Sequence, residues 1–154
     1  MGMEEYDSEG RFMRADYGDL SIVSVYHPSG TSGDERQAFK MVWLEKFRQY
    51  VVKLQRTRPK LILCGDYNIC HEAIDIHDPV RNATNSGFLP EEREWMTRFL
   101  NEGFIDTFRL LHPDKQEYTW WSYRFNSRAK NKGWRIDYCM VNEPVRPCLL
   151  YTSD

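Results

Sequence analysis

The residues of this sequence best placed to do chemistry are Asp66 and Asn68, which follow an apolar run at residues 61–64 and the glycine Gly65. A short apolar run without charge is typical of a strand buried on both faces, and the glycine marks its end. Alternation along the extended chain places Asp66 and Asn68 on one side and Tyr67 on the other. An acid and an amide held together can orient a water molecule, share a cation or take a proton. The alternative is a plain turn in which both side chains bond only the local backbone.

The elements around this pair form a predicted strand–helix–strand unit. Residues 20–26 are rich in β-branched side chains, which favours a strand. Ser32 and Glu35 have the spacing of a capping box, and apolar residues then recur every three or four positions, as in an amphipathic helix. The two strands of such a crossover unit run parallel, so Tyr26 and Asp66 should emerge at the same edge of the sheet. Ligand crevices of open α/β sheets lie beyond that edge.

The rest of the chain predicts further elements of a mixed α/β domain. Turn residues, apolar periodicity and the positions of Pro and Gly set their approximate bounds. The long polar connection is expected to be functional because a plain connector would be shorter. In chain order we expect a hairpin at 11–26, the polar connection at 69–89, a helix at 90–103, a strand or helical turn at 104–112, and strands at 118–123 and 134–141.

The composition indicates one folded domain without a membrane segment. The 154 residues are 41% hydrophobic and 14% aromatic, enough for a packed core. The sequence has no apolar run long enough to span a bilayer, no signal-peptide pattern and no C-x-x-C spacing. We therefore expect a monomeric cytoplasmic protein with reduced thiols rather than a zinc knuckle or a disulfide framework. The cysteines are Cys64, Cys70, Cys139 and Cys148.

The small net charge of −2 hides a basic segment. Residues 118–136 carry five Lys or Arg and no Asp or Glu, whereas the rest of the chain is acidic. A local positive segment on an acidic body is typical of a phosphate-binding loop, and the alternative is a solvated loop with chance charge. The basic side chains of this segment are Arg124, Arg128, Lys130, Lys132 and Arg135.

Several motifs, in order over nearly the whole chain, resemble the exodeoxyribonuclease III family of apurinic/apyrimidinic endonucleases. The resemblance implies a four-layer α/β sandwich of the deoxyribonuclease I-like type, in which two sheets pack face to face under flanking helices. The matching stretches are VYHPSG at 25–30, CGDYN at 64–68, HEAID at 71–75, NATNSGF at 82–88, PEER at 90–93, YTWW at 118–121 and GWRIDY at 133–138.

The same resemblance indicates that residues 1–154 are part of such a domain. The family pattern begins with strands that carry an Asn and a Glu, both metal ligands, and ends with a Ser-Asp-His strand that supplies a catalytic His. This sequence holds neither, and residues 148–154 do not look like family sequence. We therefore expect an incomplete sandwich that covers most of the family's second half, with little or no activity and poor stability by itself.

The resemblance also implies a DNA-repair nuclease that cuts the phosphodiester 5′ to abasic sites and removes nucleotides from 3′ ends of duplex DNA. Asp66 would be the general base for in-line attack by water, and Asn68 would orient Asp66 or stabilise developing charge. Both would hold Mg²⁺, with Mn²⁺ as a substitute. Tyr26 would point its hydroxyl at the phosphate, unless it is only a strand-end tyrosine. Asp137 would orient the family's catalytic His; without it the carboxylate is unpaired or meets an arginine.

The DNA contacts implied by the resemblance come from the polar connection and the basic segment. The asparagines match the family's DNA-contacting loop, and the tryptophans match aromatics that line a pocket for a base-free sugar, with core packing as the alternative. The cationic side chains would hold the phosphate backbone, an attraction that weakens with salt. The expected contacts are Asn82, Asn85, Trp120, Arg128, Lys130, Trp134 and Arg135.

Two other functions stay open at this point. One is a phosphoesterase of the same fold that acts on a phosphoinositide, a sphingolipid or a nucleotide instead of DNA. The other is a catalytically silent DNA-binding fragment. The asparagine loop, the tryptophans and the basic segment favour DNA, and nicking of a duplex with one abasic site, with and without magnesium, separates the three.

Overall fold

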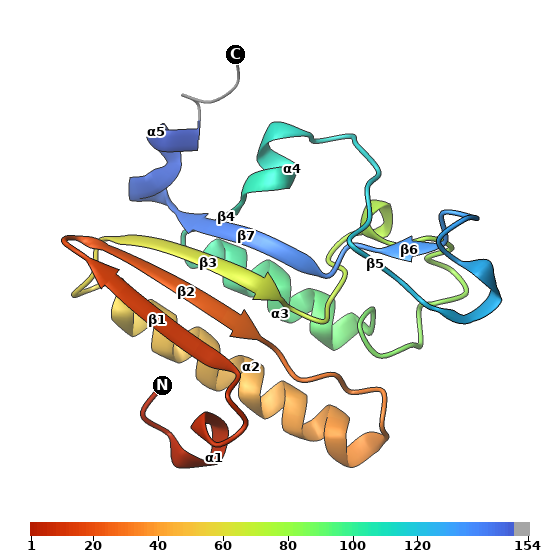
Figure 1. Ribbon diagram of the computed structural model, residues 1–154, viewed down its shortest axis with the longest axis horizontal. Helices are drawn as coiled ribbons and strands as arrows, with labels where there is room; N and C mark the ends of the chain where they lie inside the picture. The colour runs from red at the N-terminus through yellow and green to blue at the C-terminus, as the bar shows by residue number, and fades with distance from the viewer. Residues whose placement is uncertain (150–154) are drawn as a thin grey trace.

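The computed structural model describes residues 1–149, except the side chain of Glu5. Its centre is a five-stranded sheet in the order β1-β2-β3-β7-β4, in which β2 and β3 are parallel and the other neighbours are antiparallel (Figure 1). A separate ribbon of β5 and β6 projects from one end of the molecule. The strands are β1 (Phe12–Tyr17), β2 (Leu20–Tyr26), β3 (Lys60–Asp66), β4 (Phe104–Asp106), β5 (Trp120–Trp121), β6 (Gly133–Trp134) and β7 (Asp137–Asn142).

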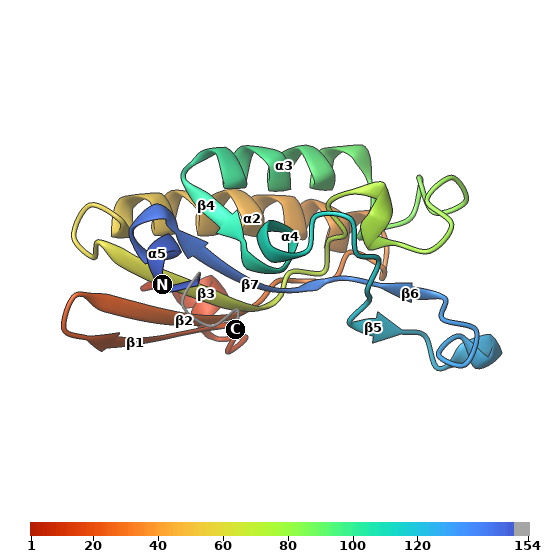
Figure 2. The same ribbon diagram turned by 90° about the horizontal axis from the view of Figure 1, so that it is seen from above.

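Two long helices, α2 and α3, lie side by side on one face of the sheet (Figure 2). The core between the helices and the sheet is rich in aromatic side chains, among them Trp43, Phe47, Trp95 and Phe99. No helix among residues 1–149 has the length and apolar character needed to cross a bilayer. The helices are α1 (Glu4–Asp7), α2 (Asp34–Leu54), α3 (Pro90–Asn101), α4 (Thr107–Leu111) and α5 (Arg146–Leu149), with short 3₁₀ turns at Ala73–Asp75, Arg124–Asn126 and Glu143–Val145.

The predicted crossover unit is confirmed. Strands β2 and β3 are parallel, and Tyr26 and Asp66 are register partners at the same edge of the sheet. The predicted capping box is wrong: α2 begins at Asp34, and Gly33 occupies the cap position without a side-chain hydrogen bond. The acidic first turn of α2 still complements the positive end of the helix dipole.

The second half of the chain is more broken than predicted. Residues 104–111 form both expected alternatives, the short strand β4 followed by α4, with the Asp106 carboxylate accepting a hydrogen bond from the Arg109 amide at 3.1 Å. The strand expected at 134–141 is divided, because the chain leaves the β5–β6 ribbon at Trp134 and enters the main sheet at Asp137. The turn between these strands carries Arg135 into the interior.

The face of the sheet opposite α2 and α3 carries several exposed apolar side chains. Side chains alternate along β2, so that Val23 and Val25 are buried against the helices while Ile22, Ser24 and Tyr26 face away. Met13 and Tyr17 of the neighbouring strand β1 are also largely exposed. Apart from the β5–β6 ribbon, residues 1–149 therefore provide one five-stranded sheet and one helical layer, two of the four layers of a deoxyribonuclease I-like sandwich.

Candidate active site

A cavity of about 700 Å³ opens at the end of β2 and β3. Its floor is made by the predicted residues Tyr26, Asp66 and Asn68, so the crossover unit brings them together as expected. Loops after β2 and before α3 form one wall, and the β5–β6 ribbon forms the other. The remaining lining residues are Ser29, Thr31, Ser86, Gly87, Trp120, Arg124, Trp134 and Ile136.

The backbone at Gly65 explains how Asp66 reaches this cavity. Gly65 has a φ of 146°, and a Cβ there would lie 1.8 Å from the carbonyl oxygen of Val25. Only glycine allows β3 to approach β2 this closely. The strand can therefore stay paired with β2 until it delivers Asp66 opposite Tyr26.

Asp66 and Asn68 bond to the local backbone, as in the plain turn considered above, and both residues also line the cavity. Asp66 Oδ1 accepts a hydrogen bond from the Asn68 backbone N–H at 2.7 Å. The Asn68 amide donates to the carbonyl of His27 at 2.8 Å and to Asp66 Oδ2 at 3.4 Å. These bonds fix both side chains and leave Asp66 Oδ2 with little demand on its lone pairs.

The electrostatic surroundings of Asp66 favour a proton acceptor. Partial burial is the main reason that its pKa rises to about 6, and the Asp137 carboxylate adds to the rise. The hydrogen bond from Asn68 and the charge of Lys40 oppose it. Among residues 1–149 no Lys, Arg or His forms an ion pair with Asp66. A carboxylate with a pKa near neutrality suits general base catalysis.

Asp137 faces Asp66 across the sheet, because the two residues are register partners on β7 and β3. The Asp137 side chain is exposed, and its carboxylate has no hydrogen bond or ion pair within the described part of the chain. Of the two alternatives left by the sequence, the unpaired carboxylate is therefore the correct one here. Tyr26 stands at the edge of the cavity with 51% of its surface exposed, and its ring lies 4.8 Å from the Arg11 guanidinium.

A buried ion pair that was not predicted from the sequence bonds to the backbone of two segments that line the cavity. Lys40 and Glu92 are completely buried, and Lys40 Nζ lies 2.5 Å from Glu92 Oε1. Lys40 Nζ also donates to the carbonyl of Asn68 at 2.8 Å. Glu92 Oε2 accepts hydrogen bonds from the backbone of Gly87 at 2.6 Å and Leu89 at 3.0 Å. One pair thus fastens both the turn that carries Asn68 and the loop that forms the opposite wall.

A sequence signal for this pair exists. Lys40 lies on the apolar stripe of α2 with Trp43, Leu44 and Phe47, and Glu92 lies on the stripe of α3 with Trp95, Met96 and Phe99. Each helix therefore has one charge where its buried face should be apolar. Two such exceptions of opposite sign predict an ion pair between the helices, because a buried charge needs a partner.

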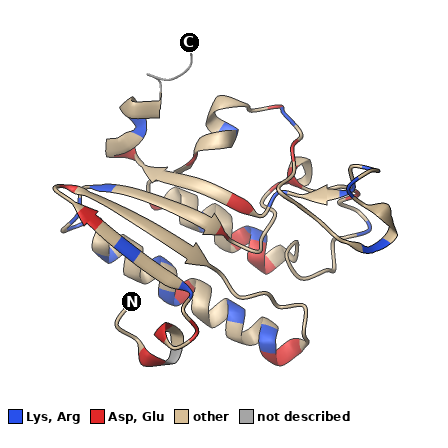
Figure 3. Ribbon diagram, viewed as in Figure 1, with Lys and Arg blue, Asp and Glu red and all other residues tan. Residues whose placement is uncertain are grey.

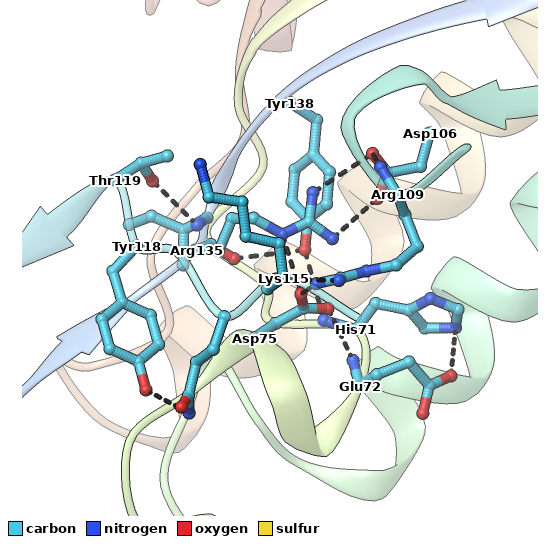
Figure 4. A network of polar contacts seen from close by, with 12 residues as sticks. His71, Glu72, Asp75, Asp106, Arg109, Lys115, Tyr118, Thr119, Arg135 and Tyr138 are labelled. Carbon is cyan, nitrogen blue, oxygen red and sulfur yellow. Dashed lines mark hydrogen bonds and ion pairs between the residues drawn. The ribbon is translucent and has the colours of Figure 1, made fainter. Parts of the chain in front are cut away.

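Arg135 does not lie where the sequence placed it, and its assignment as a DNA contact is wrong. Its surface is 3% exposed, and its guanidinium donates to Asp75 Oδ1 at 2.8 Å and Asp106 Oδ2 at 2.7 Å (Figure 4). Arg109 joins the same cluster through a 2.6 Å bond to Asp75. Burial raises the pKa of Asp75, and the bonds from Arg135 and Arg109 outweigh it and lower that pKa. A cation enclosed by two carboxylates cannot reach a nucleic acid backbone.

The two asparagines of the polar connection differ in role. Asn82 is buried, and its amide donates to the carbonyls of His77 at 2.9 Å and Asp78 at 3.0 Å, so a direct DNA contact by Asn82 is also corrected. The side-chain oxygen Oδ1 of Asn82 accepts a 2.8 Å hydrogen bond from the side-chain Nδ2 of Asn85. Asn85 is exposed and lines a second cavity, of about 780 Å³, that continues from the first. Asn82 therefore orients Asn85.

The remaining predicted DNA contacts lie on the β5–β6 ribbon and the loop between its strands. Trp120 and Trp134 are cross-strand partners whose rings meet edge to face at 6.4 Å, and both line the cavity. The Arg128 guanidinium lies 5.4 Å from the centre of the Trp121 ring, and Lys130, two residues further along the loop, is exposed. Figure 3 shows Lys and Arg residues on the loop at the ribbon end of the molecule. Arg124 lines both cavities from the same loop.

Comparison with known proteins connects this site to characterised relatives. Residues 3–154 match the sequence model of the Endonuclease/Exonuclease/phosphatase family. An exodeoxyribonuclease of Bacillus subtilis is 43% identical over 147 residues, covering 95% of this chain and 58% of that protein. The DNA repair nuclease APEX1 of Danio rerio is 43% identical over 150 residues, 97% of this chain and 48% of that protein.

The arrangement in space agrees with these sequence matches. An AP endonuclease from Archaeoglobus fulgidus superposes with a TM-score of 0.87 and 30% sequence identity, covering 96% of this chain and 58% of that one. The chain spans about half the length of the curated relatives it matches.

Proposed function

The chain belongs to the endonuclease/exonuclease/phosphatase family, and from this premise we propose that it contributes the Asp66 site to a DNA-repair nuclease. The reaction is hydrolysis of the phosphodiester 5′ to an abasic site and of 3′-terminal nucleotides in duplex DNA. The observation that carries this proposal is that the Asp66–Asn68 pair forms the floor of a cavity that Trp120 and Trp134 also line. The relatives named exodeoxyribonuclease and DNA repair nuclease support the same choice of substrate.

In the proposed mechanism Asp66 accepts the proton of the attacking water. Its raised pKa, about 6, leaves it ionised and yet basic near neutral pH. Asn68 fixes the rotamer of Asp66 through the hydrogen bonds that its backbone N–H and its side-chain amide donate to the carboxylate. The exposed hydroxyl of Tyr26 donates to a phosphate oxygen from the neighbouring strand. Asp137 keeps the pKa of Asp66 high through repulsion across the sheet.

A divalent cation fits the donor chemistry of this floor. Asp66 and Asn68 offer hard oxygen donors, and Asp66 forms no ion pair with another residue of 1–149. Mg²⁺ prefers such ligands while keeping several waters. Asp66 and Asn68 would hold the ion, with Mn²⁺ as a substitute, and the bound ion would neutralise phosphate charge. Residues 1–149 bring no three His, Cys, Asp or Glu side chains together in a metal-binding arrangement. We propose that further ligands come from protein outside this chain.

The DNA-binding surface proposed here runs from the cavity over the β5–β6 ribbon. Asn85, Arg124, Arg128 and Lys130 contact the backbone there, and the edge-to-face Trp120–Trp134 pair borders the space for a base-free sugar. Such contacts position the duplex without reading sequence. We further propose a monomer that works in the cytoplasm, which agrees with four free thiols.

A catalytically silent DNA-binding role is the second candidate. It is favoured by the missing third metal ligand within residues 1–149 and by the open face of the sheet. The test is a nicking assay on a duplex with one abasic site, with and without magnesium, beside a binding assay on the same duplex. Magnesium-dependent nicking by a preparation of the complete domain supports the nuclease. Binding without nicking supports the silent role, and hydrolysis of only non-DNA phosphoesters contradicts both.

A further inference from the structure

A buried histidine, His27, is hydrogen-bonded through its backbone to both residues of the Asp66–Asn68 pair. It follows Tyr26 at the end of β2, and its side chain is completely buried. The His27 backbone N–H donates to the carbonyl oxygen of Asp66 at 2.8 Å. The His27 carbonyl oxygen accepts a hydrogen bond from the side-chain Nδ2 of Asn68, also at 2.8 Å. A displacement of the His27 backbone therefore disturbs hydrogen bonds to both residues of the pair.

The His27 imidazole lies in the aromatic core between the sheet and the helices. It stacks on Tyr67, with the ring centres 4.4 Å apart and the ring planes 23° from parallel. Phe47 of α2 meets the imidazole edge to face at 4.6 Å, and Trp95 of α3 does so at 5.8 Å. These three partners are completely buried and belong to this chain. The burial of His27 is therefore complete within residues 1–149 and needs no protein from outside them.

The hydrogen bonding of the imidazole fixes its orientation and indicates a neutral ring. Trp43 Nε1 donates to His27 Nδ1 at 3.3 Å. An indole N–H can only donate, so Nδ1 carries no proton and the ring proton lies on Nε2. Within residues 1–149, Nε2 has no hydrogen-bond partner. Since His27 does not line the cavity either, its side chain can act on the site only through the residues that it contacts.

The contact that matters most is the stack on Tyr67. Tyr67 is the residue between Asp66 and Asn68, and its buried ring points into the core while its two neighbours line the cavity. Stacked aromatic rings prefer a defined separation and offset. The His27 ring therefore restricts where the Tyr67 ring can lie, and with it the backbone of the turn that carries the pair.

We propose that His27 is a positioning residue, whose ring, stacked on Tyr67, sets the place and orientation of the Asp66–Asn68 turn. The effect of this role on catalysis rests on the proposed nuclease function. The positioning itself does not, because the order of the turn can be measured without any substrate.

The first measurement is amide hydrogen exchange in the full chain, followed by NMR. The Asn68 backbone N–H, which donates to Asp66 Oδ1, reports the order of the turn. Its exchange should accelerate roughly tenfold or more in His27→Ala, because the turn then opens locally. His27→Phe keeps a flat ring on Tyr67 and should stay within about twofold of the unmodified chain. His27→Leu fills similar space without a flat ring, so it should accelerate exchange and decides the question if His27→Ala does not fold.

The second measurement uses a complete domain that nicks abasic DNA. His27→Ala should lower kcat there by roughly tenfold or more and change KM less, because a misplaced carboxylate activates water poorly. His27→Phe should restore most of the lost kcat. If no preparation nicks, including the unmodified one, the proposed nuclease function is contradicted and the exchange result still decides the positioning role.

Phe104→Ala is the matched control for a general loss of stability. It removes a buried ring from the same core, and Phe104 pairs with Asn142 at the opposite end of β7 from Asp137. It should lower the melting temperature and leave the exchange of the Asn68 amide largely unchanged. The proposal is overturned if Phe104→Ala accelerates this amide as much as His27→Ala does. It is equally overturned if folded His27→Leu exchanges the Asn68 amide at the rate of the unmodified chain.

Discussion

Asp66 and Asp75 are both carboxylates withdrawn from solvent, and the chain surrounds them in opposite ways. Asp75 is fully buried, and Arg135 and Arg109 each bond to it at less than 3 Å. Asp66 is half-buried, borders a cavity, and has another carboxylate, Asp137, as its register partner. The pKa of Asp75 is consequently lowered despite burial, whereas burial and Asp137 raise that of Asp66 to about 6.

The difference shows how one fold separates structural charge from chemical charge. Burial penalises an ionised carboxylate at both places; cations outweigh the penalty at Asp75, whereas the charge of Lys40 offsets only part of it at Asp66. The cluster of Asp75, Arg135, Arg109 and Asp106 joins the polar connection, the segment before β7 and the start of α4 into one unit. Most of the desolvation cost of ionised Asp66 is not offset, so this carboxylate is available to bind a cation or take a proton.

The largest effect should come from removing the available carboxylate. Asp66→Asn, introduced into a preparation of the complete domain that nicks abasic DNA, should lower turnover by more than the ~10²–10⁴-fold typical of a lost general base. The excess follows because Asp66 is also proposed to hold the metal. Duplex binding should persist in a fluorescence anisotropy assay. Asp114→Asn makes the same chemical change at an exposed residue and should leave turnover unaltered; near-normal turnover in Asp66→Asn would move the base role elsewhere.

The next largest effect should come from breaking the structural cluster. Arg135→Ala leaves Asp75 and Asp106 buried without their shared cation, so the free energy of unfolding should fall by about 3–5 kcal/mol. Urea denaturation measures this loss. Arg56→Ala is the control, because Arg56 is exposed and substitutions of that kind usually change stability by about 0.5 kcal/mol or less. Equal losses in both variants would mean that the cluster adds no stability.

The pH dependence of stability should have opposite signs for Asp66 and Asp75, because the pKa of Asp66 is raised and that of Asp75 is lowered. The folded-state pKa of Asp66 is raised, so its stabilising contribution is full below the unfolded pKa of about 4 and is lost as pH rises through 6. Asp66→Asn removes that loss and should melt above the unmodified chain at pH 7–8, with the two converging near pH 4. The lowered pKa of Asp75 predicts the reverse for Asp75→Asn. Melting curves from pH 4 to 8 decide between them, and a lower melting temperature of Asp66→Asn at pH 8 would contradict the argument.

The smallest effect concerns exposed cations, in contrast to the buried Arg135. Arg128→Ala with Lys130→Ala should weaken duplex binding equally for all sequences and flatten the dependence of log affinity on log salt by about 0.9 for each lost phosphate contact. Lys53→Ala with Arg56→Ala removes the same charge from exposed positions at the C-terminal end of α2 and should leave the slope unchanged. An unaltered slope in the first variant would show that this loop does not meet the backbone.

The sequence was sufficient to predict how Asp66 and Asn68 reach a shared cavity. The crossover unit follows from local signals, namely apolar periodicity and the run before Gly65, so its strands and helix could be placed without tertiary information. Arg135 could not be placed in this way. It lies in a run of basic residues, and its partners Asp75 and Asp106 are 60 and 29 residues away along the chain.

Long-range pairing also explains why other site residues escaped prediction. Lys40 and Glu92 are 52 residues apart, and the sequence pairs them only when the two apolar stripes are compared. Asn82 was assigned to DNA with Asn85 because the sequence does not say which of two neighbouring amides turns inward. The expectation about residues 148–154 falls mostly outside the described residues. Local patterns fixed the elements, and only tertiary contacts divided the charged residues between interior and surface.

The Lys40–Glu92 pair has a consequence for how the walls of the cavity open. Glu92 accepts hydrogen bonds from the amides of Gly87 and Leu89, and Lys40 donates one to the carbonyl of Asn68. Neither the Asn68 turn nor the loop before α3 can therefore detach without disturbing the same two charges. Hydrogen exchange at the Gly87 and Asn68 amides, one on each segment, should therefore report one cooperative opening rather than independent fraying of the two. Substrate entry and local unfolding then both depend on the same buried Lys40–Glu92 ion pair between α2 and α3.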